Sequence, residues 1–281
     1  MTHTDKGMRS SAPFQRDKSS RKPFGAYTTG LLAVCALVAV PLLAQAGGSI
    51  TGKVSFVGKV PEPKRFAFKK FPNPDFCSKN PNKSEDGKTR LLEEVEVAKG
   101  GGLKDAIVAI RDITDDAWMK GYDGTKVAAE LCEWTKFTGV AVNKGHFIVE
   151  NHDADPDDPK SKEGVLHNPH AFEFKKPSSS TIFNIGLAKK GDSLDKKIIL
   201  RKAKKGSVVR LQCDQHEFMQ AWFLPVTNPH YVRVNEDGTF ELKDVPAGKH
   251  KLIAWHPVAG EIEKEFEVKD GGSVKANFEI K

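Results

Sequence analysis

The sequence predicts an all-β protein. Short apolar segments alternate with polar residues, as in residues 50–56 (ITGKVSF), and this period of two is typical of strands with one buried face. The 281 residues include 24 Gly and 16 Pro, which favours many short strands joined by turns. Helical periodicity is weak, and short helical turns are predicted only at 116–122 and 125–133.

Ten segments have the composition and alternation of strands. They are 50–56, 103–113, 140–151, 197–201, 207–212, 231–234, 239–242, 249–255, 261–268 and 273–280. Asp237-Gly238 and Pro246-Ala247-Gly248 are turn signals between the later ones. Residues 151–163 are dense in Asp, Pro and Lys and are predicted to form an exposed loop.

Residues 1–46 resemble an export signal. A basic leader precedes an apolar run at 31–43, and Ala44-Gln45-Ala46 provides a small-residue cleavage site. The apolar run is short for a membrane-spanning helix. We therefore expect a signal peptide and a periplasmic mature protein, with a retained N-terminal membrane anchor facing the periplasm as the alternative.

Charge and hydropathy exclude two other classes. Six basic and two acidic residues fall within 1–46, so of the net +7 only +3 belongs to the remaining residues. That balance is too weak to indicate nucleic-acid binding. Only one long apolar run exists, which excludes a protein with several membrane spans.

Three cysteines follow the leader, an odd number for an oxidising compartment. Cys77 and Cys132 lie in polar, turn-rich stretches without a nearby histidine, and we expect them to pair as a disulfide. Cys213 is followed at once by His216 and Met219. The alternatives are that all three are buried thiols, or that Cys213 pairs with one of the other two.

The stretch from Cys213 to Met219 is the most informative part of the chain. Its spacing, Cys-x2-His-x2-Met, presents a thiolate, an imidazole and a thioether from one tight loop after a strand. Two histidines, a cysteine and a weak axial methionine are the ligands of blue-copper electron-transfer sites. His167-Asn168-Pro169-His170 offers the second imidazole. The pattern predicts one copper ion.

These two motifs resemble those of the cupredoxins, most closely the amicyanin type. That family has a His-Asn-Val-His run and a Cys-x2-His-Pro-Phe-Met loop. The resemblance implies a Greek-key β-sandwich with His167, Cys213, His216 and Met219 as copper ligands. Asn168 would link the two ligand segments by hydrogen bonds, and His170 is the alternative first ligand.

Two departures from the family accompany this resemblance. Glu217 replaces the proline of the family loop, and Pro169 replaces the valine between the histidines. Neither removes a ligand. His216 is expected to be the exposed edge of the site, through which electrons enter or leave. Glu217 would therefore place a carboxylate beside an exposed ligand. Phe218, Trp222 and Phe223 are expected to shield the ion from water.

A second resemblance lies in residues 235–252. Asp-Gly-Thr-Phe, then Pro-Ala-Gly and another strand, is similar to the carboxypeptidase regulatory-like (transthyretin-like) β-sandwich. That family also has a Gly-x-Val strand, found here at 52–54. We therefore expect residues 47–113 and 227–281 to form a small discontinuous sandwich, interrupted by a cupredoxin domain at 114–226.

The sequence supports three functions. The first is a periplasmic type 1 (blue) copper protein that carries single electrons between redox partner proteins. The second is a periplasmic copper-binding or delivery protein with the same ligands, and the third is a metal-free extracellular interaction module. No second His-rich cluster indicates an oxygen-reducing copper enzyme, so we predict that the protein is not an enzyme.

Overall fold

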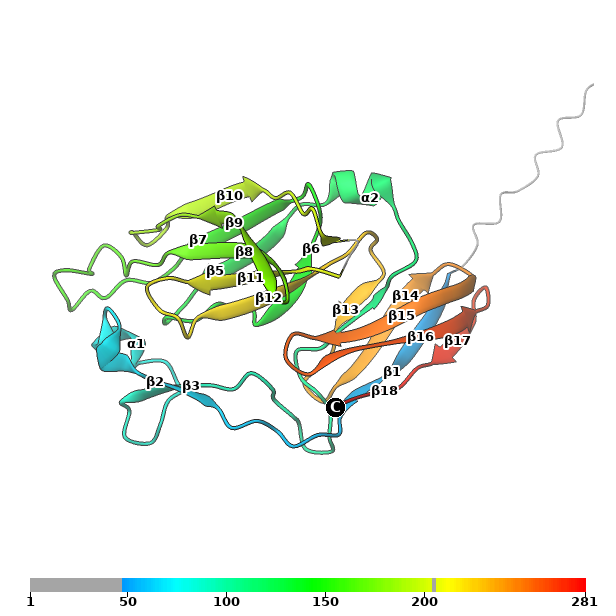
Figure 1. Cartoon of the computed structure of the whole chain (residues 1–281), viewed down its shortest axis with the longest axis horizontal. Helices are drawn as coiled ribbons and strands as arrows, with labels where there is room; N and C mark the ends of the chain where they lie inside the picture. Colours follow the sequence, from blue (N-terminus) through cyan, green and yellow to red (C-terminus); the bar gives the residue numbers. More distant parts are fainter. Residues whose placement is uncertain (1–46, 204–205) are drawn as a thin grey trace, which may run out of the picture. The chain divides into compact units, whose positions relative to one another are not determined.

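The computed structural model describes residues 47–203 and 206–281, whose regular secondary structure is mostly strand with a few short helices (Figure 1). The predicted all-β fold is therefore confirmed. The predicted export signal lies outside the described residues. Within the described ranges, no helix has both the length and the apolar character needed to cross a membrane.

Eight strands, β5 to β12, form two sheets that we call the central sandwich. One sheet has the order β10-β7-β5 and the other β6-β12-β11-β8-β9. Their bounds are β5 Thr125–Ala129, β6 Thr138–Ala141, β7 His146–Asn151, β8 Pro169–Lys175, β9 Ser178–Asn184, β10 Ser193–Lys197, β11 Val208–Cys213 and β12 Gln220–Pro225. One apolar cluster, including Phe147, Leu211 and Phe223, fills the space between the sheets.

The remaining long strands form the terminal sandwich. Its sheets are β14-β1-β17, with β18 also paired to β1, and β13-β4-β15-β16. The bounds are β1 Gly48–Phe56, β4 Ile107–Ile110, β13 Tyr231–Arg233, β14 Thr239–Val245, β15 Gly248–His256, β16 Gly260–Val268, β17 Ser273–Lys275 and β18 Phe278–Ile280. Strands from both ends of the chain thus share one sandwich, with its own core around Ile50, Leu252 and Phe278.

Residues 64–92 form a separate segment, which we call the strap. It contains β2 Lys64–Ala67, the 3-10 turn η1 Phe68–Lys70, the short helix α1 Pro74–Cys77 and β3 Thr89–Leu92. Strands β2 and β3 pair only with each other. Phe68, Phe76 and Cys77 belong to the core cluster of the central sandwich, although the predicted domain boundaries group this segment with the terminal one.

The structure corrects several sequence predictions of local structure. The strand predicted at 197–201 overlaps β10 only at Lys197, and the strand predicted at 273–280 is divided into β17 and β18. Residues 125–133 are not helical: Thr125–Ala129 is strand β5, because its β-branched and apolar side chains are buried beside β7 in parallel pairing. Residues 140–151 are not one strand but the end of β6 and all of β7. Lys144 between them has a φ of 65°, and the Gly145 N–H donates to the Val142 carbonyl, which forms a turn.

The helical turn predicted at 116–122 is present as α2, Asp116–Gly121. The Asp115 side chain caps it by accepting a hydrogen bond from the Trp118 N–H, as expected of an N-cap aspartate. A third apolar cluster joins β4 and β15 to the central sandwich through Ile107, Trp222 and Trp255.

Candidate metal centre

Strand β11 delivers Cys213 to one end of the central sandwich. Its side chains alternate, so Val209, Leu211 and Cys213 face the core. Antiparallel pairing sets Cys213 opposite Pro169 of β8, which places the segment just before β8, with His167 and Asn168, next to the cysteine. Register within the five-stranded sheet therefore brings the two distant motifs together.

The loop after Cys213 is folded into two successive turns. The His216 N–H donates to the Cys213 carbonyl at 3.3 Å, and the Met219 N–H donates to the His216 carbonyl at 2.8 Å. The Cys213 N–H donates in turn to the Met219 carbonyl at 3.1 Å, which closes the loop, and Trp134 Nε1 donates to the same carbonyl. Both ends of the loop are thus fixed, and the Met219 side chain at its end is buried.

Three potential ligand atoms converge at this end. Cys213 Sγ lies 3.8 Å from His167 Nδ1 and 3.7 Å from His216 Nδ1, and the three residues form one group of atoms within 4.8 Å. All three side chains have no solvent exposure. For comparison, a metal with bonds of about 2.0 Å to nitrogen and 2.3 Å to sulfur holds those atoms roughly 3.7 Å apart at a trigonal angle.

Hydrogen bonds on the far side of each imidazole fix its orientation. His167 Nε2 lies 2.8 Å from Asp153 Oδ2, and His216 Nε2 lies 3.1 Å from the carbonyl oxygen of Pro72. A carboxylate and a carbonyl accept, so each Nε2 is the donor, and in the neutral ring each Nδ1 keeps its lone pair toward Cys213, whereas a protonated ring can donate from Nδ1 to the sulfur. This arrangement is characteristic of metal-binding histidines.

Asp153 was not predicted from the sequence. It is 3% exposed and ionised, because burial, which raises its pKa, is outweighed by bonds from His167 and from the backbone N–H groups of Leu131 and Cys132 that lower the pKa. The loop predicted to be exposed at 151–163 is therefore partly buried. No local motif distinguishes Asp153 from its acidic neighbours; only the fold brings it to His167.

Cys213 lies in surroundings that favour its thiolate. Burial raises the pKa of Cys213, but hydrogen bonds with His167 and His216 outweigh burial and lower it to about 6. The Asn168 N–H adds a donor 3.3 Å from Sγ. Burial lowers the pKa of His167, yet its bonds to Asp153 and Cys213 raise the net value.

The donor set of His167, Cys213 and His216 fits a soft cation. Electron-rich atoms that face one another repel, whereas a cation bound by all three is attracted to each of them. One thiolate and two imidazoles suit copper in particular. The residues present therefore fit the group that the sequence predicts.

Two sequence predictions about this site need correction, and one is refined. His216 is not an exposed edge: its side chain is fully buried, and Phe218 packs against it with ring centroids 5.6 Å apart. Glu217 therefore does not flank an exposed ligand. Asn168 does link the ligand segments, but through its backbone, because its N–H donates to Cys213 Sγ and its carbonyl accepts from the Asp214 N–H.

His170, the alternative ligand, lies outside the cluster. Its ring nitrogens contact Asp214 Oδ2 at 2.9 Å and Thr181 Oγ1 at 3.0 Å on the surface of the sheet. Of the aromatic residues predicted to shield the ion, Phe218 contacts His216, whereas Trp222 packs against Phe174 and Phe223 against Phe147 in other core regions. The expected Cys77–Cys132 disulfide is present.

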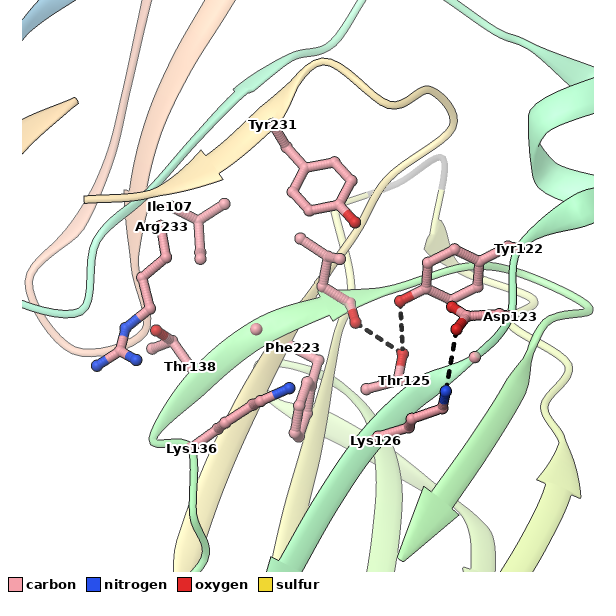
Figure 2. Close-up of a pocket in the computed structure, with 13 residues that line it drawn as sticks. Ile107, Tyr122, Asp123, Thr125, Lys126, Lys136, Thr138, Phe223, Tyr231 and Arg233 are labelled. Carbon is pink, nitrogen blue, oxygen red and sulfur yellow. Dashed lines mark hydrogen bonds and ion pairs between the residues drawn. The ribbon is translucent and has the colours of Figure 1, made fainter. Parts of the chain in front are cut away.

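Figure 2 shows a cleft elsewhere, of about 390 Å³, lined by residues of both sandwiches. Two pairs of its polar groups contact each other: Lys126 Nζ lies 2.9 Å from Asp123 Oδ2, and the Tyr122 hydroxyl lies 3.3 Å from Thr125 Oγ1 (Figure 2). Burial raises the pKa of Tyr231 in this cleft to about 12. No member of the His167, Cys213 and His216 cluster lines it.

Comparison with protein-family models finds no match for the sequence, and comparison with curated proteins finds none either. Solved structures give distant likenesses. A purple cupredoxin from Nitrosopumilus maritimus is 12% identical, with a TM-score of 0.27 over 36% of this chain and 99% of that one. A mutant of amicyanin is 13% identical, with a TM-score of 0.26 over 42% of this chain and 98% of that one.

A copper-containing nitrite reductase from Thermus scotoductus is 10% identical, with a TM-score of 0.28 over 37% of this chain. The match spans 23% of the length of that reductase. At these scores the likenesses do not assign a family or an activity. The chemistry of the site is therefore judged from the geometry of its own residues.

Proposed function

We propose that this chain is a type 1 copper protein that carries single electrons between redox partner proteins. The observation that supports the proposal is the convergence of Cys213 Sγ, His167 Nδ1 and His216 Nδ1 in a fully buried site, with both imidazoles oriented by acceptors behind them. The central sandwich that holds them would be a cupredoxin domain at 114–226, inserted in a carboxypeptidase regulatory-like sandwich at 47–113 and 227–281.

Each residue has a distinct part in this proposal. Cys213 would bind as thiolate, His167 and His216 through Nδ1, and Met219 as a weak thioether ligand. When bound, copper supplies a one-electron couple between Cu(I) and Cu(II). Asp153 holds the His167 ring in place, and the Asn168 N–H donates to the thiolate sulfur, which withdraws electron density from it.

Rigidity of the donors favours electron transfer over copper delivery. A delivery protein must pass its ion to a partner by ligand exchange, which needs an accessible ligand. Here His167, Cys213 and His216 have no solvent exposure, and short hydrogen bonds hold them in place. Electrons can tunnel through buried bonds, so burial does not oppose electron transfer. Copper delivery is the second candidate function, and a metal-free interaction module is the third.

We also propose that the mature protein is periplasmic, released by cleavage after Ala46 or anchored there by its N-terminal segment. The protein would act on other redox proteins rather than catalyse a reaction of its own. The side chains of His167, Cys213 and His216 have no solvent exposure, which argues against a reaction whose substrate must reach them.

A potentiometric titration of the copper-loaded protein tests the proposal. We expect one copper ion per chain, reversible one-electron oxidation and reduction, and fast electron self-exchange. An ion that binds but is reduced irreversibly or sluggishly would support delivery. If the protein takes up no copper in equilibrium dialysis, both copper functions are excluded and the metal-free interaction module is favoured.

A further inference from the structure

The strap forms the cover of the metal site. The carbonyl oxygen of Pro72, in the strap, accepts a hydrogen bond from His216 Nε2 at 3.1 Å. Three strap aromatics, Phe66, Phe68 and Phe71, surround Phe218 of the ligand loop, with ring centroids 5.1 to 6.1 Å from it. The strap therefore lies against the fully buried ring of His216 and against the ligand loop.

Non-covalent contacts also hold the strap in place. Phe68 and Phe76 are buried in the core of the central sandwich, Asn80 Nδ2 donates to the Leu131 carbonyl at 3.0 Å, and Lys79 Nζ lies 3.2 Å from Asp155 Oδ1. Strands β2 and β3 of the strap pair only with each other, and an isolated two-stranded ribbon is at best marginally stable. A buried Arg90 contacts Glu133 Oε1 at 2.6 Å and also donates to Asn80 within the strap. Such contacts can break and re-form reversibly, whereas one further tie is covalent and lies directly beside the site.

That tie is the Cys77–Cys132 disulfide. It joins α1 of the strap to the segment after β5 in the central sandwich. Both sulfur atoms are within 4.8 Å of a ring nitrogen of His216, and Cys132 Sγ is also within 4.8 Å of His167 and Asp153 atoms. The strap cannot lift from His216 while residues 77 and 132 are bonded to each other.

We infer that the Cys77–Cys132 disulfide controls how fast the metal site exchanges its ion. This inference rests on the proposed copper site and adds a regulatory part to it. With two free thiols, the strap can open and an ion can enter or leave past His216. Disulfide formation removes two electrons and two protons from the thiols, which pass to a protein disulfide that becomes a dithiol, and the site is then closed.

Burial of both sulfur atoms indicates that copper loads before the disulfide forms. Cys77 and Cys132 are each 1% exposed, so a dithiol reductant cannot reach the bond while the strap is closed. The copper ion would therefore load before the disulfide forms, and afterwards it would be retained. A retained ion suits an electron carrier, which must not lose its metal during repeated encounters with partners.

The experiment compares the disulfide-bonded full chain with the Cys77→Ala/Cys132→Ala variant. Metal-free protein is treated with iodoacetamide, and the alkylation rate of Cys213 is followed by mass spectrometry of its peptide. Copper-loaded protein is mixed with excess Cu(I) chelator, and the transfer rate is followed. We expect both rates to rise at least tenfold in the double variant.

Leu252→Ala is the matched control for a general loss of stability. Leu252 is fully buried in the core of the terminal sandwich and does not belong to the cluster that includes the strap. We expect its Cys213 alkylation rate to stay within about twofold of the parent at 25 °C, since local opening of the strap does not depend on it.

Two results would overturn the inference. One is a double variant whose Cys213 is alkylated no faster than in the parent. The other is a Leu252→Ala variant alkylated as fast as the double variant, which would assign the exposure to global unfolding. The alkylation measurement uses metal-free protein. A parent protein that binds no copper would therefore contradict the proposed function, while the alkylation rates would still test whether the disulfide closes the site.

Discussion

Replacement of Asp153 by Asn tests whether the His167 orientation matters for metal binding. In the structure Asp153 Oδ2 lies 2.8 Å from His167 Nε2, and the same carboxylate accepts the N–H groups of Leu131 and Cys132 at 2.6 and 2.8 Å. An asparagine has one acceptor oxygen and one donor group. Its NH2 must face either His167 Nε2–H or the backbone N–H of Leu131, and both are donors.

If the NH2 group faces the imidazole, His167 moves its proton to Nδ1 and loses the lone pair that faces Cys213. Removal of the carboxylate partner of a metal-binding histidine typically lowers metal affinity about 10- to 100-fold. That range corresponds to roughly 1.4 to 2.8 kcal/mol in the free energy of copper binding. We expect Asp153→Asn to lower the Cu(I) affinity by about 10- to 100-fold.

Competition with a chromophoric Cu(I) chelator at pH 7 measures this affinity. Asp195→Asn is the matched control, because Asp195 Oδ1 contacts His146 Nδ1 at 2.6 Å in an exposed pair on β10 and β7, outside the ligand cluster. We expect the control to bind Cu(I) like the parent. Equal affinity of Asp153→Asn and the parent would refute the reasoning that the Asp153 carboxylate supports the site by orienting His167.

Three further predictions concern other parts of the chain. His170→Ala should leave the copper stoichiometry and the visible spectrum unchanged, because His170 contacts Asp214 rather than His167, Cys213 or His216. Loss of the visible band in this variant would indicate that His170 is a copper ligand after all. Burial lowers the pKa of His256 from 6.5 to about 4, so the unfolded chain binds the proton first and His256 opposes folding as the pH falls from 6.5 toward 4. The contribution of His256 to the free energy of unfolding should fall by about 3 kcal/mol between pH 6.5 and 4. Urea titrations at several pH values should show this fall in the parent and not in His256→Asn. The Cys77→Ala/Cys132→Ala variant, which opens a cross-link between residues 55 apart, should lose about 4 kcal/mol of the free energy of unfolding; a loss below 1 kcal/mol in denaturant titrations would mean that the cross-link contributes little.

The residues of the candidate site could be proposed from the sequence because most of the information is local. Cys213, His216 and Met219 share one loop, and alternation in the strand before it shows that Cys213 faces inward. His167 could be proposed from its own motif, since a His-Asn pair upstream of such a loop is uncommon. The disulfide was predicted from the number of cysteines and from the oxidising compartment that the N-terminal leader indicates.

Features that depend on long-range packing were missed. Asp153 has no distinguishing motif, and the Pro72 carbonyl that covers His216 is 144 residues away from it in sequence. The exposure predicted for His216 was wrong for that reason. Residues 125–129 looked helical because Lys, Val and Ala tolerate both structures, and only burial beside β7 decides for the strand.

The most direct test of the proposed copper site is the visible spectrum of the Cu(II)-loaded protein beside that of Cys213→Ser. We predict an intense thiolate-to-copper charge-transfer band in the parent and its absence in the variant, with the fold of both confirmed by circular dichroism. A folded parent that binds Cu(II) without that band, or a variant that keeps it, would contradict the assignment of Cys213 as the copper thiolate.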